Sequence, residues 1–252
     1  MKPTHQIPVL RKAVQVLEAI AGERCEPTAA VLARSLSIAP ATCYRILQTL
    51  AHAGWVHLGA EGRCELGLGL LPLLQRLQRH ELLGQPVQTA LLELTAATGV
   101  ASKLSAREGA EAVTLLRVAS SEPMALAVQP GARFHLSLGA SGAVLLSALP
   151  DAAIKQMLAE SPPECWQWQK PAAVWKRIRE VRRHGVALDA GTYRPDIFGI
   201  SVPLLDLEGH IQGALTLTGL IHGHSRAQLA SWRRLVLEKA AALNQGRKQK
   251  TP

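Results

Sequence analysis

The chain has 252 residues, of which 48% are hydrophobic and 19% are charged, so it can bury cores and is not a disordered chain. The length exceeds the about 100 to 200 residues that are usual for one domain, which predicts two domains. Lys and Arg number 28 against 19 Asp and Glu, a formal net charge of +9. This excess favours a polyanion or an acidic small molecule as a partner, although the C-terminal tail holds three of the charges, Arg247, Lys248 and Lys250.

No positively charged start leads into an apolar block, and no uninterrupted run of about 18 apolar residues is present. We therefore expect a cytoplasmic protein that does not enter a membrane. The cysteines share no CxxC spacing, which argues against zinc. Reduced and mostly buried thiols are expected at Cys25, Cys43, Cys64 and Cys165, and the sequence indicates no metal and no cofactor.

The first 53 residues read as three short helices. Residues 9–21 follow Pro8 and carry an apolar stripe with the 3.6-residue period of a helix, formed by Leu10, Ala13, Val14, Leu17 and Ile20. Residues 29–36 form a second helix, and a connection of about three residues precedes a third, from Pro40 to Ala53. Such a short connection holds two helices at a sharp angle, which is typical of a helix-turn-helix.

Alternating residues at 55–58 and 63–66 flank a glycine-bounded turn and predict a hairpin, which together with three helices is the winged helix-turn-helix arrangement. Residues 67–84 read as one Leu-rich helix that is too apolar to be solvated, and we expect it to pack against another copy or the next domain. The expected division is a DNA-binding domain at 1–66, a linker and dimerisation helix at 67–85, and a second domain at 86–252.

The second domain reads as α+β. Helices are expected at 87–98, 140–149, 151–160, 172–185 and 225–246, and strands at 100–106, 111–120 and on both sides of a turn at Glu208 and Gly209.

These pieces occur in an order and spacing that resemble the IclR family of bacterial transcriptional regulators over nearly the whole chain. The resemblance is carried by "LARSLSIAPATCYRILQTLAHAGWV", "GAEGRCELGLGLLPL", "GASGAVLLSALP", the strand pair around "REGAEAVTLLRV" and "VRRHGVALDAGTYRPDIFGISVPLLDLEGHIQGALTLTG". It implies a winged helix-turn-helix domain, a linker helix used in dimerisation, and a GAF-like C-terminal domain that binds a small effector. The chain departs from the family pattern at Ala143, Thr192 and Gly199, which leaves the effector open.

A helix with small, hydroxyl and guanidinium side chains in its first half can approach DNA closely in the major groove. We expect operator contacts from Arg34, Pro40, Ala41, Thr42, Tyr44, Arg45, Gln48 and, in the wing, Arg63. The alternative for each of these residues is an ordinary solvated surface. Two recognition helices on one face of the duplex require a homodimer, and the family makes a dimer of dimers plausible.

Carry-over from the family places the effector at Ala140, Ser141, Asp189, Gly199, Thr216 and Thr218. Amides at a helix start near Ser141 suit a carboxylate, so a small organic acid is expected, and Gly199 favours an aromatic or longer-chain one. Alternatives are a helix cap for Ser141, an Asx-turn for Asp189 and ordinary strand residues for the two threonines.

The sequence bears on three alternative functions. A hydrolase would need a G-x-S-x-G elbow, and "GASG" at 139–142 has its second glycine one position early. A metal held by His222 and His224 lacks Glu or Cys at ligand spacing, so a polar turn is expected there. A ligand sensor or interaction module without DNA binding stays open because Ala41 replaces a hydroxyl residue, and the direction of regulation is not determined.

Overall fold

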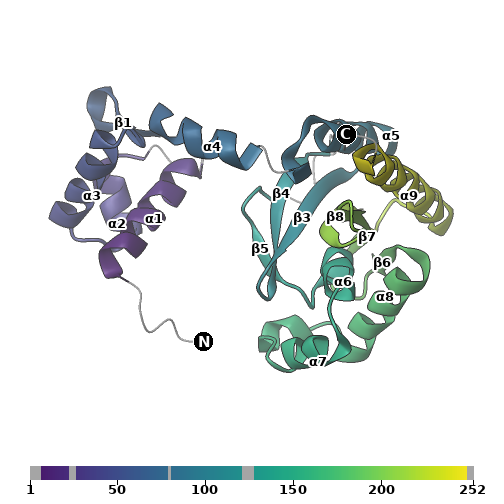
Figure 1. Ribbon diagram of the computed structural model, residues 1–252. Helices are drawn as coiled ribbons and strands as arrows, with labels where there is room; N and C mark the ends of the chain where they lie inside the picture. Colours follow the sequence, from purple (N-terminus) through teal and green to yellow (C-terminus); the bar gives the residue numbers. More distant parts are fainter. Residues whose placement is uncertain (1–6, 23–26, 79–80, 121–127, 249–252) are drawn as a thin grey trace. The chain divides into compact units, whose positions relative to one another are not determined.

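The computed structural model describes residues 7–22, 27–78, 81–120 and 128–248 (Figure 1). The chain divides into two compact units, Met1–Arg79 and His80–Pro252, each of which is described by itself. Among the described residues, no helix combines the length and the apolar character needed to cross a membrane.

The first unit is a winged helix-turn-helix, as the sequence predicted. Helices α1 (Pro8–Ala21), α2 (Ala29–Ser35) and α3 (Pro40–His52) precede a hairpin of β1 (Val56–Leu58) and β2 (Cys64–Leu66). The Thr28 hydroxyl caps α2 by accepting from the Val31 amide at 3.3 Å. Pro40 opens α3, where its missing N–H would have had no intrahelical partner. Buried side chains of all three helices and the hairpin share one small core.

The apolar stripe predicted on α1 is only partly correct. Ala13, Leu17 and Ile20 do pack on the core of the first unit, but its fully buried residue is Val16. Leu10 and Val14 are 59% and 53% exposed. α3 and β2 cover only one side of α1, and the predicted apolar stripe is wider than that covered side. An apolar surface therefore stays open on α1.

The single helix predicted over 67–84 is wrong. A 3-10 turn, η2 (Leu68–Leu70), comes first, then α4 (Leu71–Gln78), and a second 3-10 turn, η3 (Glu81–Leu83), precedes the next helix. The reason lies in the close packing of Gly67 and Gly69 on Gly54: a Cβ on Gly67 would lie 2.1 Å from the Gly54 carbonyl oxygen. That contact, with a hydrogen bond from Gly67 N to Trp55 O, holds the chain extended before Leu68.

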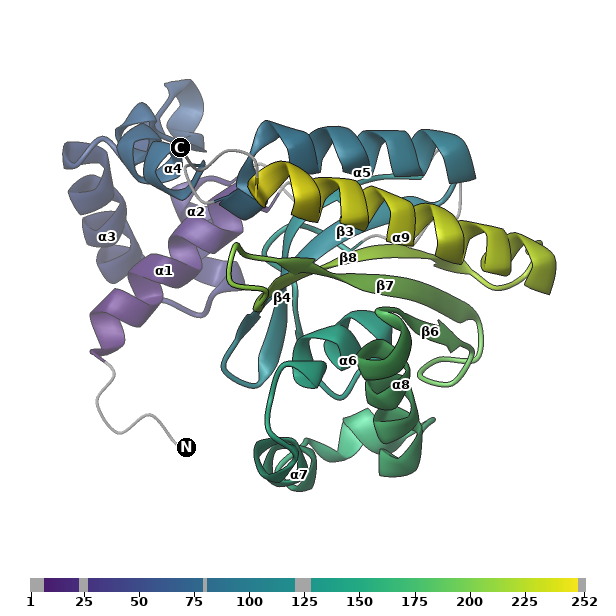
Figure 2. The same ribbon diagram turned by 45° about the vertical axis from the view of Figure 1, so that its right-hand side comes forward.

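The second unit is an α/β domain built on one antiparallel sheet with strand order β5-β4-β3-β8-β7-β6 (Figure 2). Its strands are β3 (Ala101–Glu108), β4 (Glu111–Val118), β5 (Arg133–His135), β6 (Ala187–Ala190), β7 (Ile197–Leu205) and β8 (Ile211–Leu220). Its helices are α5 (Gln85–Thr98), α6 (Gly139–Ser147), α7 (Asp151–Ala159), α8 (Pro171–His184) and α9 (Arg226–Lys248), with a 3-10 turn η4 (Pro163–Trp166). The α+β prediction with a GAF-like second domain is thus confirmed.

Helices cover both faces of this sheet (Figures 1 and 2). α5 and α9 pack on one face through a core that includes Leu104, Leu215 and Leu217. α6 and α8 pack on the other, over a core centred on Val144 and Ile178. Residues of β3 and β8 therefore alternate between two interiors, and the second of these contains the cavity described below.

Candidate functional site

The α3 helix presents a polar surface opposite its buried side. Cys43, Ile46, Leu47 and Leu50 are at most 8% exposed and belong to the core of the first unit. Of the α3 positions predicted to contact DNA, Pro40, Ala41, Tyr44, Arg45 and Gln48 are exposed and Thr42 is half-buried. All six predicted α3 residues thus lie at the surface or its margin, and none is enclosed by the unit itself.

The two other arginines expected at DNA lie on neighbouring elements. Arg34 is exposed in the last turn of α2. Arg63 is exposed just before β2 and forms an isolated bridge with Thr28, which ties the hairpin to the start of α2. The turn of the hairpin, η1 (Ala60–Gly62), has Glu61 at φ 62° and Gly62 at φ 75°. A tight left-handed tip of this kind keeps the wing short.

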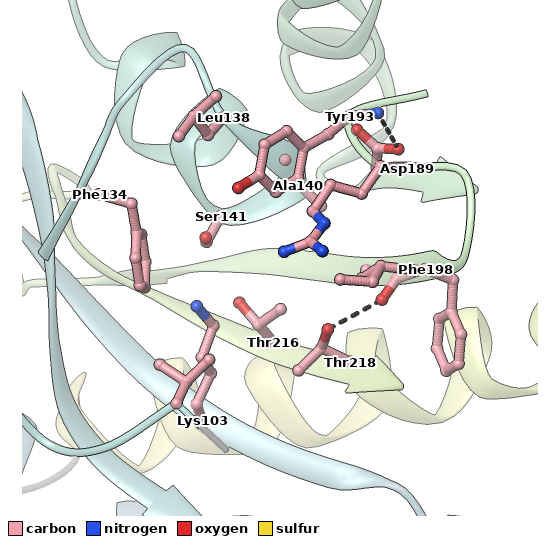
Figure 3. Close-up of a pocket in the computed structure, with 15 residues that line it drawn as sticks. Lys103, Phe134, Leu138, Ala140, Ser141, Asp189, Tyr193, Phe198, Thr216 and Thr218 are labelled. Carbon is pink, nitrogen blue, oxygen red and sulfur yellow. Dashed lines mark hydrogen bonds between the residues drawn. The ribbon is translucent and has the colours of Figure 1, made fainter. Parts of the chain in front are cut away.

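The second unit contains a cavity of about 280 Å³ between the sheet and the start of α6 (Figure 3). All six residues predicted for an effector lie at its wall, namely Ala140, Ser141, Asp189, Gly199, Thr216 and Thr218. The remaining wall is Lys103, Val128, Phe134, Leu138, Gly139, Tyr193, Arg194, Ile197 and Phe198. Its size and its mixture of apolar walls with a few polar groups suit a small molecule.

Lys103 is the group that the sequence analysis missed. It stands in the middle of β3, directly opposite Thr216 of β8, and is only 7% exposed. Figure 3 shows its amine pointing into the cavity toward Ser141. Nζ lies 4.1 Å from the centre of the Phe134 ring, and burial lowers the pKa of Lys103 to about 8. The available signal was a lysine whose neighbours on the same side of the predicted strand, Ala101 and Ser105, are both small.

The hydroxyls of the two threonines are engaged with the protein. Thr218 Oγ1 donates to the Phe198 carbonyl oxygen at 2.9 Å, and Thr216 Oγ1 is 2.8 Å from Ser201 Oγ. The two threonines lie on the same side of β8, as their spacing predicted. Because its hydrogen is directed at the Phe198 carbonyl oxygen, the Thr218 hydroxyl offers the cavity a lone pair and no donor.

Asp189 holds the loop that follows β6. Its Oδ1 accepts from the amides of Thr192 and Tyr193 at 2.9 and 3.1 Å, the geometry of the Asx-turn alternative. Its Oδ2 lies 2.7 Å from Arg177 Nη1. With both oxygens turned toward protein groups, Asp189 is placed to position Tyr193, whose ring lies at the start of α6.

The start of α6 explains "GASG" without catalysis. Gly139 has φ 65°, and a Cβ on Gly142 would lie 2.1 Å from the Leu136 carbonyl oxygen. The helix cap is Leu138, which makes no side-chain bond, so Ser141 is not the cap that the sequence left as an alternative. Gly139 supplies the left-handed backbone and Gly142 the close backbone packing, and Gly139, Ala140 and Ser141 line the cavity at the start of α6.

His222 and His224 have different surroundings and do not form one site. The His224 ring packs edge-on against Phe198 and Trp232, whereas His222 is 82% exposed in its side chain and lies near Asp196. Of the cysteines, Cys43, Cys64 and Cys165 are free and buried as expected, and Cys25 lies outside the described residues. Burial raises the pKa values of Cys43 and Cys64, which keeps these thiols protonated.

A helix-turn-helix with an exposed polar surface, followed by a domain with a small-molecule cavity, defines a transcriptional regulator with a ligand-binding domain and not an enzyme. The chain belongs to the IclR family. Residues 75–245 match the model of the bacterial transcriptional regulator IclR C-terminal domain, and residues 9–58 match the IclR helix-turn-helix domain. It is thus a transcriptional regulator with a DNA-binding and a ligand-binding domain.

Known relatives agree. The HTH-type transcriptional regulator BhcR of Paracoccus denitrificans is 26% identical over 244 residues, 95% of this chain and 87% of that protein. Two crystal structures share the fold. The IclR of Thermotoga maritima has a TM-score of 0.77 and 18% identity, and the match covers 96% of this chain and 100% of that one. An IclR homologue from Microbacterium hydrocarbonoxydans complexed with 4-hydroxybenzoate has a TM-score of 0.78 and 20% identity, with the same coverage of the two chains.

Proposed function

We propose that the protein binds operator DNA through α3 and the wing and that a small organic acid in the cavity controls this binding. The observation that carries the first half is the exposure of Tyr44, Arg45 and Gln48 on one side of α3, whose other side is buried. The dimensions of the major groove admit one such helix, and arginine binds both guanine and phosphate. Such a regulator acts in the cytoplasm, where the chromosome is.

The unit that binds DNA is a homodimer or a dimer of dimers. Apolar side chains support this proposal, because α1 and the segment before and within α4 leave them open to solvent: Ile7, Val9, Leu10, Val14, Leu66, Leu68, Leu71, Leu73 and Leu74 are 45% to 80% exposed. A second copy is a natural cover for surfaces of this kind. Two recognition helices then contact two half-sites of one operator.

The effector is a small organic acid, for which an aromatic acid is the favoured form. The cavity supports this with an aromatic ring at Phe134, the cation of Lys103 and the amides at the start of α6. The 4-hydroxybenzoate in the Microbacterium homologue shows that one protein of this fold holds an acid of that type.

A gel-shift titration against DNA upstream of the protein's own gene tests the proposal, with an unrelated duplex of equal length as control. We expect binding that is specific for the upstream DNA and weakens as salt rises, because phosphate contacts release counterions. Equal binding to both duplexes, or none, would refute operator recognition. A thermal-shift panel of acids tests the effector half separately.

A further inference from the structure

The feature that points beyond an unspecified acid is the buried charge of Lys103. Its side chain is 7% exposed, and no carboxylate of the described residues forms an ion pair with it. Its one close partner among them is the face of the Phe134 ring. A ring face attracts a cation but does not replace the water that the cation has lost. An anion beside the Lys103 ammonium would therefore offset the cost of burying that charge.

A second observation lies on the opposite wall. α6 is nine residues long and begins at the cavity with Gly139, Ala140 and Ser141, whose amides precede the first intrahelical bonds. Helix-start amides carry partial positive charge and accept an anion. Figure 3 shows the Lys103 amine directed toward the Ser141 hydroxyl, so the cation and the helix start face the same space.

The far end of the cavity has the opposite character. The Thr218 hydroxyl donates a hydrogen bond to the Phe198 carbonyl oxygen, so its own oxygen presents lone pairs, which repel a carboxylate and accept from a hydroxyl or amine. Thr218 is two residues beyond Thr216 on β8, a separation of roughly 7 Å along a strand. The cavity therefore has an anion end and an acceptor end, about one small ring apart.

We propose that the effector is a monocarboxylate bound with its carboxylate between Lys103 and the start of α6 and with a hydrogen-bond donor, such as a hydroxyl, directed at Thr218. The inference rests on the proposed function, since it names the ligand class and orientation in that cavity. Arg194 also lines the cavity but is exposed, whereas Lys103 is buried, so Lys103 is then the residue that selects acids over neutral molecules. Thr218 is the residue that selects hydroxy acids.

The experiment pairs acids with their neutral amides. Benzoate, 4-hydroxybenzoate and hexanoate, each beside its amide, are titrated by calorimetry up to millimolar concentration into the full-length protein. The variants are Lys103→Met, which keeps chain length and removes charge, Thr218→Val, and Lys155→Met as a control on the exposed surface of α7.

We expect Lys103→Met to weaken acid binding by about tenfold to a hundredfold, the range for a charge-assisted hydrogen bond, and to leave amide binding within a few fold. Lys155→Met should match the wild type. Thr218→Val should abolish the preference for 4-hydroxybenzoate over benzoate. Wild-type protein that binds no acid, binds amides as tightly as acids, or loses nothing with Lys103→Met would overturn the inference.

A gel shift of Lys103→Met without ligand tests operator binding separately from the acid site at Lys103. Retained operator binding, with the expected loss of acid binding, supports both proposals. Retained operator binding with unaltered acid affinity refutes the Lys103 site and leaves the regulator function intact. Acid binding as expected in a protein that binds no operator refutes the regulator proposal alone.

Discussion

Arg177 and Asp189 form an ion pair, Nη1 to Oδ2 2.7 Å, in which both side chains are 4% exposed. Arg177 Nη2 also contacts Gln169 Oε1 at 2.5 Å and the Ser137 carbonyl at 3.5 Å. Asp189 in turn holds the amide of Tyr193. The pair thus ties α8 to the two segments that border the cavity, the loop after β6 and the turn into α6. Burial lowers the pKa of Arg177, and the charge of Asp189 opposes this.

Asp189→Asn should destabilise the protein by about 3 to 5 kcal/mol, because it leaves a buried guanidinium without a counter-charge. Urea unfolding of the second unit measures this. The double variant Arg177→Met with Asp189→Asn should be more stable than Asp189→Asn alone, since it removes the orphaned charge. If the stability loss of the double variant equals the sum of the losses of Arg177→Met and Asp189→Asn measured singly, the two residues are not coupled and this account of the pair is wrong.

Lys103→Met should not destabilise the protein near neutral pH. The pKa of Lys103 is about 8 in the folded state against about 10.4 unfolded, so below pH 8 burial of the ammonium opposes folding. As pH rises from about 8 to about 10.4, the unfolded chain binds more protons than the folded one, and wild-type stability therefore rises. We expect the unfolding free energy of wild type minus Lys103→Met to increase by on the order of 3 kcal/mol over that window. A flat difference would show that Lys103 is not desolvated.

Acid affinity should fall as pH rises through about 8, where the free protein loses the Lys103 proton. Two neighbouring groups do not change charge near pH 8, because burial raises the pKa of Tyr193 above its ordinary value of about 10 and lowers that of His135, on the adjoining β5, below about 6.5. Calorimetry in two buffers of different ionisation enthalpy should detect proton uptake on acid binding at pH 8 and none with Lys103→Met.

Gly142 and Gly199 provide a matched pair at the helix that borders the cavity. Gly142→Ala should reduce stability strongly, by about 3 kcal/mol or more, because its Cβ would meet the Leu136 carbonyl oxygen at 2.1 Å. Gly199→Ala places a Cβ 3.4 Å from Ala140 Cβ, an ordinary contact, and should leave the melting temperature nearly unchanged. It should instead weaken acid binding, since the added methyl group occupies cavity space. Equal melting temperatures for the two variants would contradict the packing role of Gly142.

Arg45→Ala should weaken operator binding with little effect on melting temperature, because the side chain is exposed. If Arg45 contacts a phosphate, the slope of log affinity against log salt should fall by about 1, and if it reads guanine, base preference at one position should relax. Arg179→Ala, an exposed arginine of α8, is the charge-matched control. Operator affinity that is equal in the two variants would remove Arg45 from the interface.

The sequence by itself determined most of the helices and longer strands and the exposed side of α3. Four glycines that the sequence marked as helix ends or turns have positive φ in the structure, namely Gly54, Gly99, Gly185 and Gly209. These local conformations depend on residue type, which the sequence contains. The spacing of Thr216 and Thr218 likewise placed both on one side of a strand. The short strands β5 and β6 were missed, since three or four residues carry no readable period.

Only the tertiary structure decided what surrounds each polar group. It made Val16, not Leu10 or Val14, the buried residue of α1, and it enclosed Lys103 against Phe134 and brought Arg177 to Asp189. Burial and charge pairing depend on residues that are distant in the chain, so no local pattern contains them. In the sequence Lys103 is an ordinary strand residue, and only the packing of α6 on the sheet buries its charge in the cavity.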